Sequence, residues 1–451
     1  MTQGQESLML SFADNKKLTE TGPDTPMGRT FREYWMPALL SRELPHPDCP
    51  PVRLKLLGED FVAFRDTLGK VGIVKPRCPH RGANLFFGRN EGCGLRCIYH
   101  GWKFDRHGNC VDIPNATPEV ASRLMPRASI QALNVEERGD VVWAFFGESP
   151  PPLPDFEYLA MPPEQRFVSK KFQQCNWAQA VEGGLDTSHF SYLHAGVYDG
   201  EKASLLDGGK RPTLRDTNES PNHTRFRWLI EDGAPRFSVL EHDAGLLLCA
   251  ARSADDNHTY WRMTQYLVPN HSLTPGNFPE DTSLMNTWVP YDDESCWIFC
   301  YAWHPDREIS DDERARYLDG RGLFAEVDDD FLPVRRREND YLIDRDMQRD
   351  TNYTGIANIS EQDQAVADSQ GKIANRTQEM LVQTDLGITR FRATILNACQ
   401  SVEDGVQPKG TTDPTAFLVR SGDYVSDPQQ SLADVVHERF SEFAGKNIVF
   451  P

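Results

Sequence analysis

Short runs in which apolar and polar residues alternate dominate the chain between Val52 and Gly147. The clearest of them are VRLKLLGEDFVAFRD, VGIVKP, GWKFDRHGNCVDIP and LNVEERGDVVWAFFG. A period of two is the pattern of half-buried β-strands, and turns that contain glycine separate the runs. This part of the chain therefore predicts a small all-β domain.

A proline-rich segment, ESPPPLPDF at 148–156, follows and cannot continue a helix or a central strand, so it predicts a domain boundary. Beyond it, the longer runs TRFRWLIED, PRFSVLEHDAGLLLCAARS, HTYWRMTQYLVP and ESCWIFCYAWHP predict the strands of a broad antiparallel sheet. Helical patterns at roughly 309–319, 361–383 and 429–444 would pack on this sheet. The fold class expected is therefore α+β.

The segment TPMGRTFREYWMPALLSREL at 25–44 predicts a short amphipathic helix that runs into a core-forming stretch and ends at a group of prolines. We accordingly expect three parts. They are an N-terminal helical segment (1–45) that packs on the C-terminal domain, the all-β domain (46–150) and the α+β domain (151–451).

The composition limits which partners the protein is expected to bind and in which cellular compartment it is expected to lie. The net charge of −19 disfavours a surface that follows nucleic-acid phosphates. The first twenty residues lack an export pattern, and no apolar run approaches the roughly 18 to 20 residues of a membrane span. Ten cysteines in 451 residues are too dilute for a disulfide framework. We expect a cytoplasmic protein with no nucleic-acid or membrane partner.

A cluster of cysteines and histidines lies within the predicted β domain. Cys78-x-His80 is followed, after sixteen residues, by Cys97-x2-His100. Zinc fingers usually pair two cysteines in one arm and two histidines in the other, whereas each arm here carries one of each. The mixed pairing favours a [2Fe–2S] cluster with both thiolates on one iron and both imidazoles on the other, and structural zinc is the alternative.

Three neighbours of these residues have simpler interpretations. Gly82 and Gly101 lie just beyond the two arms, where they would supply tight turns that bring backbone N–H groups toward the sulfur atoms. Cys93 lies between the arms at no ligand spacing and is expected to be a core or loop thiol.

The segment EGGLDTSHFSYLH at 182–194 contains a second candidate metal site. On an ideal helix, His189 and His194 would lie roughly 140° apart, so they cannot share one face as in the HExxH zinc helix. Either the helix is broken between them, or the two histidines are unrelated.

The cluster box, CPHRG followed by C-x-YHGW, resembles that of the α subunits of Rieske non-heme iron oxygenases. Respiratory Rieske proteins have an additional cysteine in each arm, and Ala83 and Tyr99 occupy those places here. The resemblance therefore implies the oxygenase type of Rieske domain, with Cys78, His80, Cys97 and His100 as ligands of the [2Fe–2S] cluster.

The resemblance extends to the second site, where the family pattern is NW…E/N-x3-D-x2-H-x4-H. The matching residues here are Asn176, Trp177, Glu182, Asp186, His189 and His194. By this match His189 and His194 are ligands of a mononuclear Fe(II), and Asp186 is the acid that bridges ligand histidines of the two metal centres. The alternative is that Asp186 only caps or pairs within a local helix.

The third iron ligand is expected to be a carboxylate far along the chain, because a 2-His-1-carboxylate triad leaves positions open for O2. The segment beginning GIANISEQDQA at 355 resembles the phthalate dioxygenase branch, in which the Asp after Gln binds iron, and this selects Asp363. By spacing alone Glu361 and Asp368 are rivals. The chain then departs from the branch, with ADSQGKIANR where ESMGPI-x-DR is usual.

The resemblance implies an oxygenase component with a Rieske domain and a helix-grip catalytic domain of the START/Bet v1 type. It would use O2 and electrons from an NAD(P)H-dependent reductase, with flavin and ferredoxin groups as the expected carriers, to hydroxylate an aromatic substrate. Phthalate-like dihydroxylation of an aromatic carboxylic acid is the leading expectation, and O-demethylation or monooxygenation of a methoxylated aromatic acid is the alternative. The family also implies a head-to-tail homotrimer, or two stacked trimers forming a homohexamer.

Two arginines on predicted strands are candidate substrate contacts. Arg252 in CAARS and Arg262 in YWRMT could each pair bidentately with a carboxylate if they face the pocket, or lie on the solvent face if they do not. Phe190, Trp228 and Trp261 could contact an arene, although single aromatic residues are more often core.

Two functions of other classes compete with the oxygenase. A ferredoxin-type electron carrier would need far fewer residues than this chain has and would leave the second site unexplained. A hydrophobic-ligand-binding module that has lost its iron is disfavoured by the presence of His189, His194 and Asp363.

Overall fold

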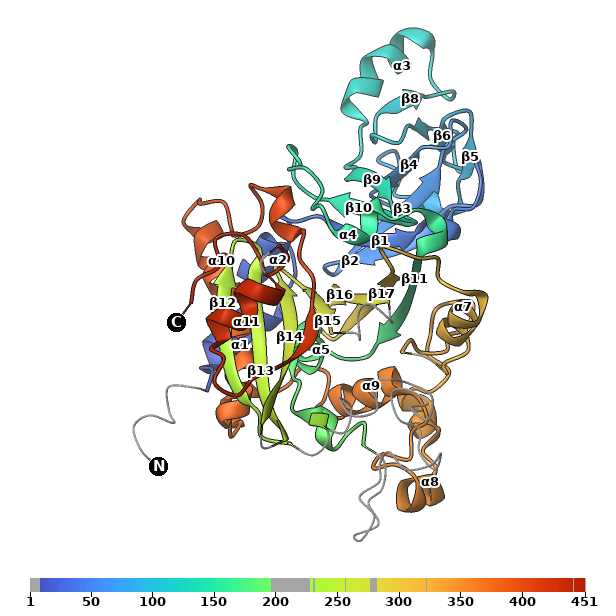
Figure 1. Cartoon of the computed structure of the whole chain (residues 1–451). Helices are drawn as coiled ribbons and strands as arrows, with labels where there is room; N and C mark the ends of the chain where they lie inside the picture. The colour runs from blue at the N-terminus through green and yellow to red at the C-terminus, as the bar shows by residue number, and fades with distance from the viewer. Residues whose placement is uncertain are drawn as a thin grey trace. The chain divides into compact units, whose positions relative to one another are not determined.

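A computed structural model describes residues 9–195, 228–229, 232–255, 257–275, 282–321, 323–440 and 442–450 (Figure 1). The chain divides into two compact units. The large unit consists of the N-terminal residues up to Glu20, Pro154–Trp288 and Asp293–Pro451, and the small unit of Thr21–Leu153 and Val289–Asp292. Among the described residues, no helix combines the length and the apolar composition needed to cross a membrane.

The small unit is built from three antiparallel sheets, which confirms the predicted all-β domain. The first joins β1 (Met36–Leu40), β10 (Val141–Phe145) and β9 (Asn134–Arg138), and the second joins β2 (Val52–Leu56), β3 (Glu59–Arg65) and β4 (Val71–Val74). The third runs β5 (Arg89–Glu91), β6 (Gly94–Arg96), β7 (Lys103–Phe104) and β8 (Cys110–Asp112). Two short helices, α2 (Pro26–Phe31) and α3 (Pro118–Leu124), complete the unit.

The N-terminal boundary differs from the expected one at residue 45. Only α1 (Phe12–Thr19) belongs to the large unit, where it contacts α10. The residues from Thr21 onward belong to the small unit, because β1 is buried at all five positions and pairs with β10. The boundary between the two units near residue 153 falls within the predicted proline-rich segment.

The large unit contains an eight-stranded sheet in the order β11-β17-β16-β15-β14-β13-β12, with β18 paired to β14. The strands are β11 (Arg166–Gln173), β12 (Arg236–His242), β13 (Gly245–Asp255), β14 (His258–Leu267), β15 (His271–Thr274), β16 (Ser283–Asp292), β17 (Ser295–Trp303) and β18 (Gly422–Ser426). Three of the four predicted strand segments are confirmed. In the fourth, TRFRWLIED, Trp228 and Leu229 are helical, and the remainder up to Glu231 lies outside the described residues.

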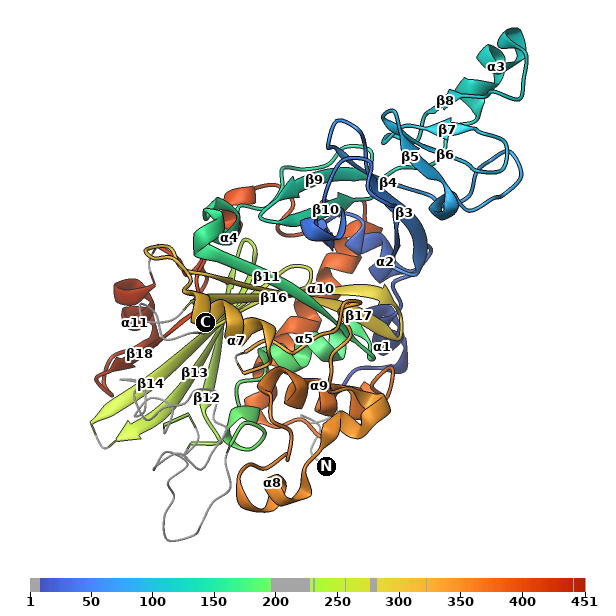
Figure 2. The ribbon, with the colours of Figure 1, turned by 90° about the vertical axis from the view of Figure 1, so that its right-hand side faces the viewer.

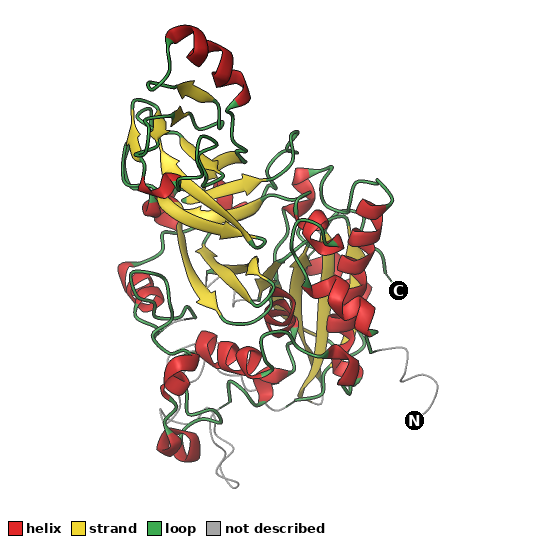
Figure 3. Ribbon diagram, turned by 180° about the vertical axis from the view of Figure 1, so that it is seen from behind, coloured by secondary structure: helices red, strands yellow, loops and turns green. Residues whose placement is uncertain are grey.

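Besides α1, the described helices of the large unit are α4 (Glu157–Ala160), α5 (Trp177–Leu185), α7 (Asp311–Leu318), α8 (Arg345–Asp350), α9 (Ile359–Ser369), α10 (Leu386–Glu403) and α11 (Leu432–Arg439). The helix predicted at 361–383 is too long, because α9 ends at Ser369 and Gly371 has a φ of +93°. The sequence interpretation missed α10, which packs against β12 and β13 (Figure 3). Helices α5 and α9 lie side by side (Figure 2).

Helix α5 brings two adjacent glycines to the wall of the main pocket. A Cβ atom added to Gly184 would lie 2.4 Å from the indole ring of Trp288, whereas one added to Gly183 would meet no atom within 4 Å. The close approach of α5 to β16 therefore requires glycine at position 184 and not at 183.

We predict that Gly184→Ala destabilises the large unit by about 1 to 3 kcal/mol, because Trp288 must move to admit the methyl group. Gly183→Ala is the matched control, and it should be neutral or stabilising by up to about 1 kcal/mol, because alanine is the better helix former. Calorimetric unfolding of the two variants measures the difference. Equal stability of the two would contradict the packing argument.

Candidate metal centres

The two cysteine arms of the small unit have the same local structure. The N–H of Gly82 donates to the carbonyl of Cys78 (2.8 Å), and the N–H of Gly101 donates to the carbonyl of Cys97 (3.0 Å). Both glycines are left-handed, with φ of +75° and +78°, as a tight turn at each arm requires. The expected tight turns are thus present, and the bonds observed for the two glycine N–H groups go to the cysteine carbonyls.

The four predicted cluster ligands lie together at these turns. The rings of His80 and His100 are 4.4 Å apart, and His80 stacks on Trp102 at 4.8 Å. Cys78 and Cys97 are buried. The Nδ1 atom of His100 is buried and has no hydrogen-bond partner among the described residues, as expected of an atom that serves as a metal ligand.

The two cysteine thiols also suit a site that holds a metal better than a core that holds none. Burial, and then the neighbouring Cys97 thiol, raises the pKa of Cys78 to about 11, although a backbone N–H of His80 opposes the shift. Without a cation the Cys78 sulfur would stay protonated at neutral pH, whereas a bound metal deprotonates a coordinating thiol. Two thiols and two imidazoles therefore form a donor set that a [2Fe–2S] cluster of the mixed type would satisfy.

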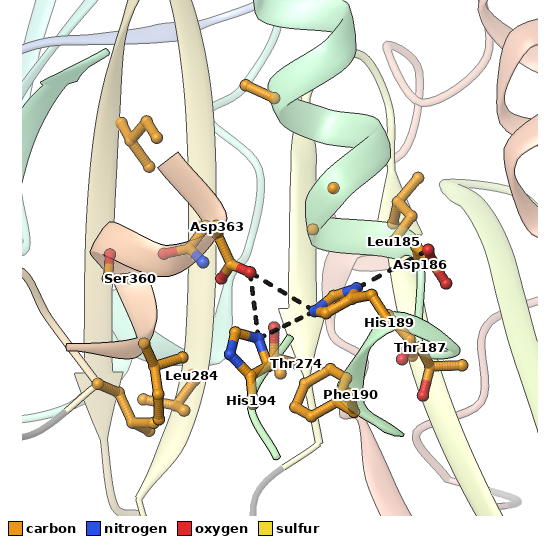
Figure 4. A pocket seen from close by; sticks show the side chains of 18 of the residues that line it. Leu185, Asp186, Thr187, His189, Phe190, His194, Thr274, Leu284, Ser360 and Asp363 are labelled. Atoms are coloured by element: carbon orange, nitrogen blue, oxygen red, sulfur yellow. Dashed lines mark hydrogen bonds and ion pairs between the residues drawn. The ribbon is translucent and has the colours of Figure 1, made fainter. Parts of the chain in front are cut away.

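The second centre joins residues from two distant parts of the large unit (Figure 4). The Nε2 atoms of His189 and His194 are 3.0 Å apart, and the Oδ1 atom of Asp363 lies 3.5 Å from the first and 3.1 Å from the second. Ligands at about 2.1 Å from a metal and at right angles to one another are about 3.0 Å apart. The three atoms are therefore spaced as one face of an octahedral site.

The expected break between the two histidines is present. Helix α5 ends at Leu185, and Asp186 has extended backbone angles. His189 begins a separate one-turn 3-10 helix that ends at Ser191, and His194 lies in the turn after it. The five-residue spacing therefore reflects two turns, and no single helix carries both imidazoles.

Gln362 fixes the tautomer of His194. Its Nε2 atom donates to the carbonyl of Ile356 (2.7 Å), so its Oε1 atom is the one that faces Nδ1 of His194, at 2.7 Å. Because an amide oxygen only accepts, Nδ1 of His194 must carry the proton, and its Nε2 lone pair is left for a metal. This neighbour lies 168 residues away in the sequence.

Asp186 has two separate contacts. Its Oδ1 atom accepts hydrogen bonds from the backbone N–H and the hydroxyl of Ser188, at 2.6 and 2.7 Å. Its Oδ2 atom lies 3.8 Å from Nδ1 of His189, on the side of the ring opposite the other two ligands (Figure 4). The carboxylate therefore both closes the local turn and faces a predicted ligand.

The rivals of Asp363 are engaged elsewhere. The Glu361 carboxylate lies 3.2 Å from the guanidinium of Arg335, and the Asp368 carboxylate accepts from the hydroxyl of Tyr341 at 2.5 Å. Among the described residues, the set of metal-ligating side chains brought together contains Asp363 and neither rival.

The electrostatics of the triad favour metal binding. Burial, followed by the neighbouring His194, lowers the pKa of His189, so the neutral imidazole with a free lone pair is the stable form. Burial alone would raise the pKa of Asp363, but His194 and His189 hold it below its usual range. Two neutral imidazoles and one carboxylate are the donor set of a facial iron site.

The triad opens into a pocket lined by α5, α9 and the sheet. Its lining includes the three triad residues, Asp186, the apolar Leu185, Phe190, Leu284 and Ile298, and the polar Lys171, Gln173, Tyr260, Arg262, Thr264 and Asn286. Arg262 thus faces the pocket, with its guanidinium 4.6 Å from the centre of the Phe190 ring. Trp261 lies in the core on the other face of the strand, and Trp228 packs on Tyr260.

Arg252 does not line the pocket. It is 1% exposed and donates to the carbonyl of Thr187 (2.8 Å) and to that of Asp232 (3.2 Å). Burial, and then the charge of Arg262, lowers the pKa of Arg252 to about 10, so it remains a cation at neutral pH.

Comparison with known families agrees with both centres. Residues 34–132 match the Rieske [2Fe–2S] domain, and residues 145–421 match the family described as LigXa C-terminal domain like. A relative from Comamonas testosteroni, the 3-chlorobenzoate-3,4-dioxygenase oxygenase subunit, is 37% identical and covers 92% of this chain and 94% of its own. The chain belongs to the oxygenase subunits of the Rieske non-heme iron oxygenases.

A second relative of this Rieske oxygenase is the phthalate 4,5-dioxygenase oxygenase subunit of Pseudomonas putida, with 33% identity over 89% of each chain. A solved structure of dicamba monooxygenase bound to dicamba shares the fold, with a TM-score of 0.56 and 18% identity over 83% of this chain and 98% of that one. The cofactors of the family are a Rieske [2Fe–2S] cluster and a mononuclear iron, and the donor sets described above fit both.

Sequence reasoning missed two residues of the catalytic centre. Gln362 lies between Glu361 and Asp363 and was passed over because amides are not metal ligands, although the orientation of His194 depends on it. Lys171 lies in the strand RFVSKKFQ, where two adjacent lysines do not reveal from the sequence which of them faces the pocket.

We predict that Gln362→Leu lowers the affinity for iron by about 10- to 100-fold, because the His194 ring loses the acceptor that orients it. Iron retained after dialysis against a chelator measures the effect, and the visible spectrum of the [2Fe–2S] cluster should be unchanged. Gln364→Leu, the same change on the same helix, serves as the control because Gln364 donates to Phe172 instead. Equal iron loss in both variants would show that Gln362 acts only on the stability of α9.

Proposed function

We propose that this oxygenase hydroxylates an aromatic carboxylic acid, with His189, His194 and Asp363 as the iron ligands. In the small unit, we propose that Cys78, His80, Cys97 and His100 hold the [2Fe–2S] cluster. The substrate class is supported by relatives named for 3-chlorobenzoate and phthalate, both of which are aromatic acids.

The observation that carries the substrate class is the position of Arg262. This arginine is 7% exposed and lines the pocket of the triad, and its Nε atom has no hydrogen-bond partner among the described residues. The carboxylate of Asp423, which lies opposite Arg262 in register on β18, accepts from the hydroxyl of Tyr260 at 2.9 Å, and no ion pair of Arg262 is found among the described residues. A buried cation without a counter-ion is costly, and a bound carboxylate would supply the missing partner through a bidentate pair.

Arg252 strengthens this site without lining it. Its NH1 atom is buried and unpartnered among the described residues, and its positive charge acts on Arg262. Two neighbouring buried guanidinium groups together attract an anion more strongly than one. We propose that Arg262 contacts the substrate carboxylate and that Arg252 supports it by holding Thr187 in the pocket wall.

The remaining residues position the reactants. When bound, the cluster supplies electrons one at a time and the iron activates O2. Leu185, Phe190, Leu284 and Ile298 offer apolar surface for an aromatic ring. The side chain of His194 is fully buried, whereas that of Asp363 is 41% exposed, so the carboxylate side of the triad is the one open to the pocket.

We further propose a head-to-tail homotrimer, alone or stacked as a hexamer, in which the cluster of one chain serves the iron of its neighbour. Around the cluster ligands the small unit exposes Phe87, Ile98 and Tyr99, which are 59%, 63% and 52% exposed. Residues 65–106 also contain nine lysines and arginines against three acids, in a chain whose net charge is −19. Five of these cations pair with carboxylates of the same unit, whereas Arg77 and Arg81, on either side of the first arm, are exposed. The surface around the cluster ligands is therefore apolar and basic, as an interface with an acidic partner requires.

The large unit offers a matching surface near Asp186. Burial and then the carboxylates of Asp186 and Glu379 raise the pKa of Asp385, which shows that the three acids lie close together. Met380 and Val382, which are 94% and 59% exposed, lie between Glu379 and Asp385 in the sequence. Glu379 is paired with Arg392, so Asp186 and Asp385 supply the negative charge of this surface. Together with the exposed apolar residues, they would complement the basic surface around the cluster of a second copy.

The electron donor is proposed to be an NAD(P)H-dependent reductase with flavin and ferredoxin groups, and the compartment is proposed to be the cytoplasm. Both proposals follow from the resemblance to the family.

Oxygen uptake tests the proposed activity. With a reductase and NADH, we expect benzoates and benzenedicarboxylates to stimulate O2 uptake, and uncharged arenes of similar size to do so weakly. Arg262→Met should abolish the preference for acids, because it removes the cation that lines the pocket. A cis-diol product marks a dioxygenase and formaldehyde from a methoxybenzoate marks a demethylase. Equal uptake with acids and uncharged arenes would refute the substrate class.

Asp186→Asn should leave both metal centres occupied and yet lower NADH-driven turnover by about 100-fold or more, because the bridging carboxylate is lost while His189 keeps its other contacts. Iron and sulfide analysis and the cluster spectrum report occupancy. Undiminished turnover would reduce Asp186 to the cap of the turn at Ser188.

Mixed oligomers distinguish electron transfer between two chains from electron transfer within one chain. Co-expressed Asp186→Asn and Cys97→Ser chains are each inactive alone, but an intact cluster and an intact Asp186 can meet across an interface. In a random ring roughly a quarter of the sites would be complete. Restored turnover supports the ring, and no restoration would contradict it.

A further inference from the structure

A second buried cation, Lys171, lines the pocket on a different wall from Arg262. It lies in β11, is 4% exposed, and its Nζ atom donates to the carbonyl of Ser360 at 2.7 Å. An ammonium group has three donors, and one carbonyl is the hydrogen-bond acceptor found for it among the described residues. The lysine is therefore incompletely satisfied inside the pocket.

The neighbouring Lys170 is also buried, but its charge is stabilised by contacts that differ from those of Lys171. The two side chains point to opposite faces of β11, as in any strand. The ammonium of Lys170 lies 4.5 Å from the ring of Trp297, 4.8 Å from that of Phe331 and 5.8 Å from that of Phe299, which together stabilise it through cation–π contacts. Lys171 instead pairs in register with Ile298, another residue of the pocket wall.

The charge of the pocket favours an anionic occupant at Lys171. The ionised groups among its described lining residues are Lys171, Arg262, Asp186 and Asp363. The two carboxylates are assigned to the iron and to the bridge between subunits, and a divalent iron adds two positive charges. Glu361 and Asp368 also interact with Lys171 from outside the lining, but the first is paired with Arg335 and the second accepts from Tyr341. The lining of the loaded pocket therefore carries an excess of positive charge, which a ligand with two negative groups would neutralise.

The two cations contact residues on different sides of the triad. Lys171 is fixed by Ser360, which precedes Asp363 by one turn of α9, and Arg262 is fixed over Phe190, which stacks on His189 at 4.7 Å. Figure 4 shows Ser360 and Phe190 on opposite sides of the three ligands. A ring that spans the triad could thus present one substituent to each cation.

We propose that Lys171 binds a second anionic substituent of the substrate, so that this enzyme prefers aromatic dianions, such as benzenedicarboxylates, to monocarboxylates. The inference rests on the proposed function, in which Arg262 binds the first carboxylate. Lys171 is then the residue that determines specificity for the second group.

The test is calorimetric binding of the three benzenedicarboxylate isomers and of benzoate to the iron-loaded, cluster-containing enzyme without reductase. For the tightest dicarboxylate, we expect Lys171→Met to raise the Kd by about 10-fold or more and that of benzoate to change little. Arg262→Met should raise the Kd of both ligands. The control, Lys170→Met, should leave the ratio of the two Kd values unchanged, because Lys170 faces away from the pocket.

The outcomes separate the two proposals. If Lys171→Met changes neither Kd, or raises both equally, the inference is wrong, while acid-stimulated O2 uptake by the unmodified enzyme would leave the proposed function standing. If the unmodified enzyme binds benzoate as tightly as every dicarboxylate, the inference is also wrong. If it binds no aromatic acid at all, both proposals fail. Iron content and unfolding temperature exclude a general effect of each substitution.

Discussion

A largely buried carboxylate, that of Glu182, joins the parts of the large unit that carry the candidate iron site. It accepts from Nε of Arg376 at 2.8 Å and from Nε of Arg392 at 2.7 Å, and so links α5 to the segment after α9 and to α10. Burial would raise the pKa of Glu182, but the two arginines hold it below its ordinary value. A buried ion network of this kind gains little net stability, yet the loss of one member leaves the others unpaired and costs about 3 to 5 kcal/mol. The position of α5, and with it the turn that holds Asp186 and His189, therefore depends on this contact.

The pocket combines a metal triad with two cations, Arg262 and Lys171, for which no ion pair within 4 Å is found among the described residues. Asp363 and Asp186 are the acids of the pocket lining, and both face a histidine of the triad. Arg262 and Lys171 remain for the substrate. Charge and shape therefore act together, because the apolar wall offers surface for a ring while the two cations fix how that ring is oriented relative to the iron ligands.

The sequence revealed the cluster site more fully than the iron site, for a physical reason. Cys78, His80, Cys97 and His100 lie in two short turns of similar pattern, so their spacing already favours a [2Fe–2S] cluster over structural zinc. His194 and Asp363 come from distant segments, and the assignment of Asp363 over Glu361 needed the resemblance to a family until the structure showed Glu361 beside Arg335. The strands followed from alternation, but α10 was missed because its buried face includes Gly387 and Arg392, which do not look apolar. The orientation of Lys171 depends on strand register, which the sequence does not specify.

The contact between His194 and α9 has a consequence for stability. Gln362 bonds His194 across 168 residues, and Asp363 on the same helix adds a second point of attachment through the metal. An iron held by His194 and Asp363 would act as a cross-link that closes a loop of about 170 residues, and a cross-link of that length removes a large share of the freedom of the unfolded chain. The iron would thus stabilise the folded catalytic unit as a disulfide does in a secreted protein, and the enzyme would lose stability, as well as activity, whenever the metal is removed.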